Sequence, residues 1–265
     1  MNEWRAMPES AQGEVKSSVR TLHILKLLSD HQNGLTFTEI QKSLDIPKSS
    51  LFVLLSTIQQ EKWIEFDPKL NRFTLGIQAW ESTQQYLNSS QLISIAESHI
   101  TDMMNDLHSS VHLAVLSGCD ALYLAQIKSD RSYDLPSRVG IRLPAQATAL
   151  GKSLLTGCSD AEITKLFENF VFKKFNSSTI SNLEDLLKEV HKVKLQGFSE
   201  SNGELIERFY CVAAPVTDRS GKVVAAISST VPKRYLDEKK ISKDRMQECV
   251  QDEARQVSEE FWAYS

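Results

Sequence analysis

The chain has no run of apolar residues long enough to cross a membrane, although 41% of its 265 residues are hydrophobic. A membrane-spanning helix needs about 20 consecutive apolar residues, so neither a transmembrane helix nor a membrane partner is predicted. The first 16 residues, MNEWRAMPESAQGEVK, are polar and lack the apolar segment of a secretory signal. They are predicted to form a flexible tail.

Cysteine is scarce as well. The four cysteines stand at positions 119, 158, 211 and 249 and form no C-x-x-C pair. Four in a chain of this length are too few for a disulfide scaffold. The sequence therefore predicts a reduced, cytoplasmic setting.

The chain also lacks a strongly basic region. Residues 17–76 contain seven Lys or Arg and six Asp or Glu, a net charge of +1, which leaves −5 for the other residues and −4 for the whole chain. Domains that bind nucleic acid through a bulk positive field carry much more charge. Any contact with DNA must therefore come from a few locally arranged side chains.

The motifs of common enzyme classes are absent. Neither G-x-S-x-G, G-x-G-x-x-G nor H-E-x-x-H occurs. The tripeptide GKS at 151–153 resembles the end of a phosphate-binding loop, but the first glycine of that motif would fall on Gln146. His108 and His112 have no cysteine pair upstream that would complete a zinc site. We predict no catalytic site, no cofactor and no metal, and interpret Gly151 as a close packing contact within a helix.

What the sequence does contain starts with a predicted helix after Ser17-Ser18. Apolar residues there recur at helical spacing. They are Val19, Leu22, Leu25 and Leu28, with Ile24 and Leu27 widening the stripe. Asn33-Gly34 then indicates a helix end and a turn.

Two further helices are predicted next. Thr36 and Glu39 have capping-box spacing, with Leu35 and Ile40 as the surrounding hydrophobic staple, which places the second helix over 37–44. Pro47 suits the first turn of the third helix. The residues of that helix expected to face inward are Leu51, Leu54, Leu55 and Ile58.

After the third helix the pattern changes to that of strands. KWIEFD alternates as a strand does, PKLN is a turn and RFTLG is the return strand. Three helices followed by a two-stranded ribbon are typical of a winged helix-turn-helix, here over residues 17–76.

Residues 77–90 are predicted to form a polar linker helix, and residues 91–265 a second, α+β domain. Its predicted strands are VHLAVL, ALYLAQI, YCVAAPVTD and KVVAAISSTV, of which the last two are apolar enough to be buried on both faces. Helices are predicted after Gln91, within TALGKSLLTG, and near the C-terminus. Two more are predicted to begin at the capping boxes Ser159…Glu162 and Ser181…Glu184.

Two separate segments of the sequence resemble the IclR family of transcriptional regulators. The N-terminal match is SVRTLHILKLLSDHQNGLTFTEIQKSLDIPKSSLFVLLSTIQQEKWIEFDPKLNRFTLG, and the C-terminal matches are LPAQATALGKSLL and GFSESNGELIERFYCVAAPVTDRSGKVVAAISSTVP. The resemblance implies an α+β protein with a winged helix-turn-helix joined by a linker helix to a GAF-like effector-binding domain. It also implies a homodimer or homotetramer that binds a palindromic double-stranded DNA operator and responds to a small carboxylate or aromatic metabolite.

The third helix departs from the family pattern. Where the family usually has a histidine-arginine pair, this chain has Phe52 and Val53. Valine contacts neither phosphate nor a guanine edge, but both residues can contact thymine methyls, which favours A·T-rich sites. A weakened DNA contact is the alternative. The candidate DNA-binding residues are Thr36, Lys48, Ser49, Ser50, Phe52, Val53, Ser56, Lys69 and Arg72.

The resemblance also implies a ligand pocket in the second domain. Its candidate residues are Leu143, Ala149, Leu150, Phe209, Cys211, Ser228 and Thr230. The hydroxyls of Ser228 and Thr230 would donate to an anionic ligand, helped by backbone N–H groups at a helix start, and the apolar residues would close the pocket. In relatives that sense glyoxylate or pyruvate, an acidic residue lies near the position of Ser201, so a different ligand is expected here. Residues 199–208 are interpreted as a polar loop.

Two other function classes compete with a ligand-responsive regulator. A sensor that acts through protein contact would fit the missing arginine of the third helix. An enzyme built on the C-terminal fold would need a nucleophile and a base, and the sequence offers no such constellation. Salt-dependent retention on DNA would separate the first two classes, and turnover of a carboxylate would indicate the third.

Overall fold

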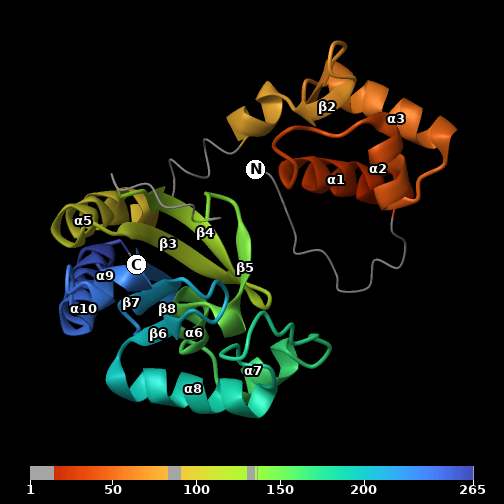
Figure 1. The fold of residues 1–265 in the computed structure, drawn as a ribbon. Coiled ribbons are helices and arrows are strands. Elements are labelled where there is room, and N and C mark those ends of the chain that lie inside the picture. The colour runs from red at the N-terminus through yellow and green to blue at the C-terminus, as the bar shows by residue number, and fades with distance from the viewer. Residues whose placement is uncertain (1–14, 83–90, 130–134, 136, 265) are drawn as a thin grey trace, which may run out of the picture. The chain divides into compact units, whose positions relative to one another are not determined.

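The computed structural model describes residues 15–82, 91–129, 135 and 137–264. The chain divides into two compact units, Met1–Ser89 and Ser90–Ser265 (Figure 1). Within the described residues, no helix is long and apolar enough to span a membrane.

The first unit is a helix-turn-helix with a two-stranded wing (Figure 1). Its elements are α1 (Lys16–Ser29), α2 (Phe37–Leu44), α3 (Lys48–Gln60), β1 (Ile64–Asp67) and β2 (Arg72–Leu75). The two strands pair antiparallel, and Leu35 adds a bridge to Phe73. The predicted three helices and ribbon are therefore confirmed. Residues 77–82 begin the predicted linker helix, whose remaining part lies outside the described residues.

Local hydrogen bonds explain where α2 begins and ends. The Glu39 backbone N–H donates to Thr36 Oγ1 at 3.3 Å, and the Thr36 backbone N–H donates to Glu39 Oε2 at 2.7 Å. These bonds form the predicted capping box, and the bond from the Thr36 backbone lowers the pKa of Glu39. Asp45, with φ of 48°, ends the helix in the left-handed region. Leu35 and Ile40 are buried in the core beneath it, as the staple predicted.

The predicted apolar stripe of α1 was wrong at Leu22, which is 64% exposed. The residues of α1 that are buried are Ile24 and Leu28, four positions apart on one face. Leu22 precedes Ile24 by two residues, about 200° around the helix. It therefore points away from the core that α1 shares with α2 and α3.

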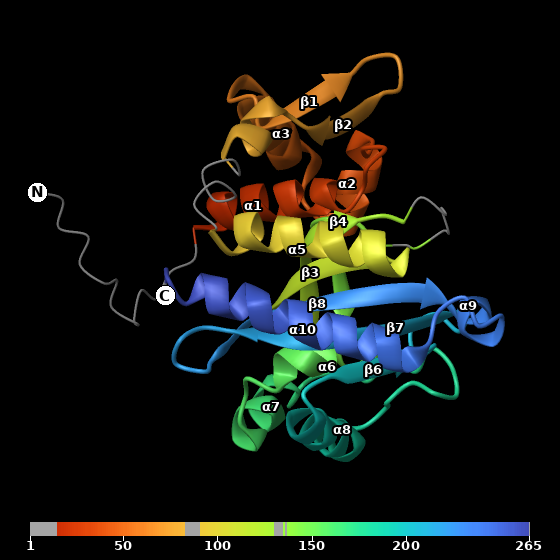
Figure 2. The ribbon, with the colours of Figure 1, turned by 90° about the vertical axis from the view of Figure 1, so that its left-hand side faces the viewer.

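The second unit is built on a six-stranded antiparallel sheet with helices on both faces (Figures 1 and 2). The strands in spatial order are β5 (Arg142–Pro144), β4 (Asp120–Ile127), β3 (Ser110–Ser117), β8 (Val223–Pro232), β7 (Phe209–Thr217) and β6 (Ser199–Asn202). Helices α5 (Gln91–Leu107) and α10 (Lys243–Phe261) cover one face (Figure 2). The short helix η1 (Ala145–Ala147) and α6 (Ala149–Leu155) pack on the other. Outside α6 lie α7 (Asp160–Leu166) and α8 (Leu183–Gln196), and α9 (Lys233–Asp237) follows β8.

The central strands confirm the prediction of a sheet buried on both faces. Ile227 of β8 belongs to the core beneath α5 and α10, whereas its neighbour Ala226 belongs to the core beneath α6. The close packing predicted at Gly151 is also confirmed. A Cβ atom there would lie 2.2 Å from Ala145 Cα, so α6 rests directly on the backbone of η1.

Two predictions about helix starts and loops were wrong in detail. Helix α8 is capped by Asn182, not by Ser181, because the Asp185 N–H donates to Asn182 Oδ1 at 2.8 Å and Asn182 Nδ2 donates to Asp185 Oδ2 at 2.7 Å. The same reciprocal pattern therefore forms one residue later. The predicted loop over 199–208 contains strand β6, because Ser199–Asn202 pairs with the edge of β7. The capping box of Ser159 and Glu162 is confirmed.

Candidate functional site

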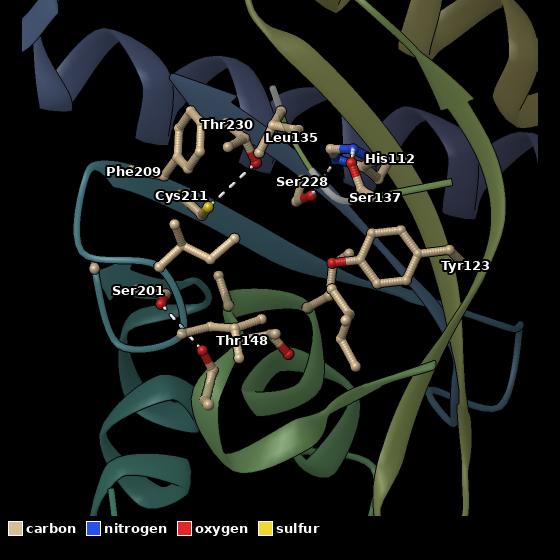
Figure 3. Close-up of a pocket in the computed structure, with 17 residues that line it drawn as sticks. His112, Tyr123, Leu135, Ser137, Thr148, Ser201, Phe209, Cys211, Ser228 and Thr230 are labelled. Atoms are coloured by element: carbon tan, nitrogen blue, oxygen red, sulfur yellow. Dashed lines mark hydrogen bonds between the residues drawn. The ribbon is translucent and has the colours of Figure 1, made fainter. Parts of the chain in front are cut away.

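A cavity of about 50 Å³ lies between the sheet of the second unit and α6 (Figure 3). The structure brings all seven candidate effector-binding residues to its wall. They are Leu143, Ala149, Leu150, Phe209, Cys211, Ser228 and Thr230. They come from β5, α6, β7 and β8, so residues distant in the sequence share one small space.

The register of the sheet explains why the polar wall residues meet. Ser201 of β6 is paired with Cys211 of β7, which is paired with Thr230 of β8. In the neighbouring row, Ser228 of β8 is paired with His112 of β3. Because side chains two residues apart on a strand share a face, both rows point to the cavity (Figure 3).

The sequence did not indicate several wall residues. They are His112, Tyr123, Leu135, Ser137, Ala147, Thr148, Gly203, Leu205 and Ile206. His112 was interpreted as an ordinary histidine, and Tyr123 sits in a strand whose pattern is apolar. The pairing that turns both toward the cavity is a property of the assembled sheet. Besides the seven candidates, Ser201 also lines the wall, and the family resemblance had placed it near the ligand.

The wall is mostly apolar, with a few polar side chains, and it carries no Lys, Arg, Asp or Glu among the described residues. Complete burial lowers the pKa of His112 to about 3, so its imidazole is neutral. Burial likewise raises the pKa of the Cys211 thiol to about 11 and raises the pKa of the Tyr123 phenol. The cavity therefore offers neutral hydrogen-bonding groups on an apolar background.

One side of the cavity is closed by the segment after β6, where Gly203, Leu205 and Ile206 contribute to the wall. Asn176 Nδ2 donates to the carbonyl oxygens of Gly203 at 2.7 Å and Glu204 at 3.1 Å. The Thr179 hydroxyl donates to Glu204 O at 2.6 Å. Side-chain donors from residues 176–179 thus hold the backbone of this segment in place.

The candidate DNA-binding residues lie in the first unit. They differ in solvent exposure and in whether they already form hydrogen bonds within that unit. Phe52 and Val53 of α3 are 66% and 62% exposed. Lys48 and Ser49 at the start of α3 are exposed, as is Lys69 in the turn between the wing strands, whereas Ser50 and Ser56 are half-buried. The exposed side of α3 therefore carries two large apolar side chains, Phe52 and Val53.

Thr36 and Arg72 already make bonds within the unit. Thr36 caps α2. The Arg72 guanidinium donates to Gly34 O at 2.6 Å and lies 3.4 Å from Glu39 Oε2. Arg72 therefore joins the wing to the turn before α2, in addition to any contact it makes with DNA.

Two cations that the sequence did not single out lie beside α3. Lys16 and Arg20 of α1 line a shallow groove together with Ser49, Ser50 and Val53. They are on the element that precedes the helix-turn-helix. Their place beside α3 follows only from the packing of α1 against it.

In the predicted linker helix, Tyr86 and Leu87 lie outside the described residues. Ala79 is half-buried and Trp80 is exposed. No group of three or more His, Cys, Asp or Glu side chains in the described part of the chain is placed to hold a metal ion.

Comparison with known families gives two matches that divide the chain as the structure does. The model described as IclR helix-turn-helix domain matches residues 17–68. The model described as Bacterial transcriptional regulator IclR C-terminal matches residues 84–259.

Curated relatives match over nearly their whole length. The HTH-type transcriptional regulator XynR of Escherichia coli (strain K12) is 28% identical over 233 residues, which are 88% of this chain and 92% of the relative. The HTH-type transcriptional repressor AllR of the same strain is 25% identical over 248 residues, 94% of this chain and 91% of the relative.

Solved structures share the fold. The crystal structure of the Thermotoga maritima IclR has a TM-score of 0.72 at 22% identity, covering 94% of this chain and all of that one. An IclR homologue from Microbacterium hydrocarbonoxydans, crystallised in complex with 4-hydroxybenzoate, has a TM-score of 0.82 at 18% identity with the same coverage.

Proposed function

The chain belongs to the IclR family and is a DNA-binding transcriptional regulator with a C-terminal effector-binding domain, and from this premise we propose what it binds. It binds a palindromic operator as a homodimer or homotetramer in the cytoplasm, and a small metabolite in the cavity of the second unit changes its affinity for that operator. The observation that supports the effector site is that seven residues chosen from the sequence line one cavity.

The effector is a short-chain aliphatic carboxylic acid. The volume of about 50 Å³ corresponds to roughly four water molecules at about 10–15 Å³ each. A buried cavity that holds benzene has about 150 Å³, three times as much. A homologue was crystallised with an aromatic acid, but the present cavity is small for an aromatic ring.

The carboxylate is held by neutral donors. Ser228 and Thr230 place hydroxyls on the same face of β8, and the described wall residues include no cation. The apolar side chains of Leu143, Leu150 and Phe209 surround the alkyl part of the ligand. Hydrogen bonds to a charged group contribute about 1.5–3 kcal/mol each, which gives a modest affinity for so small a ligand.

The test is a double substitution, Ser228→Ala with Thr230→Val, which removes both hydroxyls with little change in volume. We expect ligand affinity, measured by calorimetry, to fall at least tenfold, with release from operator DNA shifted to higher ligand concentration. Ser229→Ala is the matched control, because Ser229 lies between them on the other face of β8 and donates to Ser109 Oγ. Unchanged affinity in the double variant would place the effector site elsewhere.

In this proposal the exposed apolar residues of α3 contact the bases of the DNA, and basic residues on α1, α3 and the wing contact its phosphates. Phe52 and Val53 contact thymine methyls. Lys16, Arg20, Lys48 and Lys69 supply the phosphate contacts that the absent arginine would otherwise make. Selection from a random DNA library should enrich A·T-rich palindromes, and sedimentation should show a dimer or larger species at micromolar concentration.

A second candidate function is a sensor that acts by protein contact. The observation in its favour is the exposure of Phe52 and Val53, because a large apolar side chain on a surface is also typical of a protein-binding site. Retention on DNA separates the two functions. Binding that weakens steeply with salt and favours the selected palindrome supports the regulator, whereas weak binding without sequence preference supports the sensor.

A further inference from the structure

Among the described residues, Tyr123 and the His112–Ser228 pair leave hydrogen-bonding capacity unused at the cavity wall. Tyr123 is only 6% exposed, yet its hydroxyl bonds to no residue within the described ranges, and Figure 3 shows it directed into the cavity. The contact between Ser228 Oγ and His112 Nδ1 is long, at 3.5 Å. Buried polar groups normally have partners, so these groups indicate a place for ligand atoms.

A β-bulge explains why Tyr123 faces the cavity. In the pairing of β3 with β4, His112 is opposite Gln126 and Ala114 is opposite Tyr123, with a register shift between Leu113 and Ala114. One extra residue on β4 therefore puts Gln126 and Tyr123 on the same face, although they are three positions apart. The rings of His112 and Tyr123 consequently meet edge to face, with centroids 5.2 Å apart.

The neighbours of His112 favour one tautomer of its neutral ring. Gln126 Nε2 lies 3.1 Å from His112 Nε2 and donates to Ser137 Oγ at 2.7 Å. Ser137 Oγ also lies 3.0 Å from His112 Nε2. An amide nitrogen can only donate, so we assign His112 Nε2 as the acceptor from Gln126. The single proton of the neutral ring is then on Nδ1, which faces Ser228 at the cavity wall.

We propose that the Tyr123 hydroxyl and the His112 Nδ1–H bind a second oxygen of the effector, separate from its carboxylate. The ligand is therefore a short-chain acid that also carries a hydroxyl or carbonyl oxygen. This inference rests on the proposed function, because it assumes that the effector occupies this cavity. Both donors are fixed before the ligand arrives, His112 by Gln126 and Ser137 and Tyr123 by the bulge.

The site should discriminate against acids that lack this second oxygen. An alkyl chain against Tyr123 and His112 would leave both buried donors unpaired. A site built to bond a ligand oxygen discriminates strongly against the analogue that lacks it. These two residues therefore determine which acids are accepted, whereas Ser228 and Thr230 hold the carboxylate common to all of them.

The experiment compares acids of equal carbon number on the full chain. Butyrate, 2-oxobutyrate and the 2-, 3- and 4-hydroxybutyrates are titrated by calorimetry into the wild type, Tyr123→Phe and Tyr235→Phe. Tyr123→Phe removes only the hydroxyl, and Tyr235 is a buried tyrosine that does not line the cavity. We expect at least one oxygenated acid to bind the wild type fivefold to tenfold more tightly than butyrate. The advantage should persist in Tyr235→Phe and vanish in Tyr123→Phe, with butyrate affinity unchanged.

A further variant separates failure of this inference from failure of the proposed function. Ala149→Leu fills the cavity from the start of α6, and thermal unfolding confirms that it folds. If Ala149→Leu abolishes binding while Tyr123→Phe keeps the full preference, the cavity is the effector site and the role of Tyr123 is wrong. If binding survives in Ala149→Leu, or the wild type binds none of the five acids, both the ligand class and the donor assignment are overturned.

Discussion

Lys152 Nζ lies 2.6 Å from Glu204 Oε1, although Lys152 is only 1% exposed. Glu189 Oε1 is 3.7 Å from the same ammonium. The buried Lys152 ammonium therefore joins α6 both to α8, through Glu189, and to the segment after β6 that closes the cavity, through Glu204. Each residue of the GKS tripeptide has a structural role. Gly151 packs on η1, Lys152 forms the ion pair, and the Ser153 hydroxyl donates to Ala213 O at 3.0 Å. All three residues hold α6 in place, and none is needed for a phosphate.

Replacing Lys152 by Met should destabilise the second unit by about 3–5 kcal/mol, because it leaves Glu204 buried without its cation. Urea unfolding of the full chain measures this loss. Adding Glu204→Leu should recover most of it, since an apolar pair often replaces a buried ion pair without loss. If the double variant is no more stable than the single one, the loss comes from packing and not from the uncompensated carboxylate.

The stability of the Lys152→Met variant should also depend on pH. Burial raises the pKa of Glu204 even with the Lys152 ammonium beside it, and removing that ammonium should raise it further. A folded-state pKa above the unfolded value means that the folded state binds the proton more tightly. The stability of Lys152→Met should therefore rise as pH falls from 8 toward 5, and more steeply than that of the wild type.

Ligand affinity, by contrast, should change less than twofold between pH 6 and 8.5. His112 has a pKa of about 3 and Cys211 of about 11, and the pKa of Tyr123 is raised, so these wall groups stay neutral. The ligand carboxylate is ionised throughout this range. Lys152 and Glu204, the charged groups that influence Cys211, are paired with each other. Calorimetry across this range provides the measurement. A steady fall in affinity as pH rises would show that a cationic His112 binds the ligand.

The size of the cavity makes a separate prediction about aromatic acids. 4-Hydroxybenzoate should bind at least tenfold more weakly than the best four-carbon acid, because its ring would have to push the wall apart. Leu143→Ala enlarges the cavity from β5 and should narrow that difference. Tight binding of 4-hydroxybenzoate to the wild type would mean that the cavity opens readily, and the preference for aliphatic acids would be wrong.

Local signals predicted much of the fold, and long-range pairing accounts for the rest. The capping box of Thr36 and Glu39 uses residues three apart, so the sequence alone located α2. Strand β6 was taken for a loop because its sequence, SESN, has no apolar residue, and only the edge of β7 makes it a strand. Tyr123 was missed for the same reason, since the bulge that turns it inward exists only when β3 and β4 pair.

The first unit offers the sharpest test of how DNA is bound without an arginine in α3. Arg20→Ala should weaken binding to selected and random DNA alike, because Arg20 is assigned to phosphate. In a plot of the logarithm of the binding constant against the logarithm of the salt concentration, the slope should become less steep by about 0.9 per subunit. Lys26→Ala is the matched control. It removes the same charge from an exposed site on α1 that does not line the groove with α3. Equal losses in both variants would mean that only net charge matters.

Arg72→Ala should behave differently from Arg20→Ala. The Arg72 guanidinium donates to Gly34 O at 2.6 Å and joins the wing to the turn before α2. Its loss should lower the thermal unfolding temperature of the first unit as well as DNA affinity, whereas Arg20→Ala should leave unfolding unchanged. Unfolding followed by circular dichroism, beside filter binding on the selected operator and on random DNA, separates the two roles. If Arg72→Ala weakens DNA binding without any loss of stability, its bond to Gly34 contributes little, and Arg72 acts in DNA binding alone.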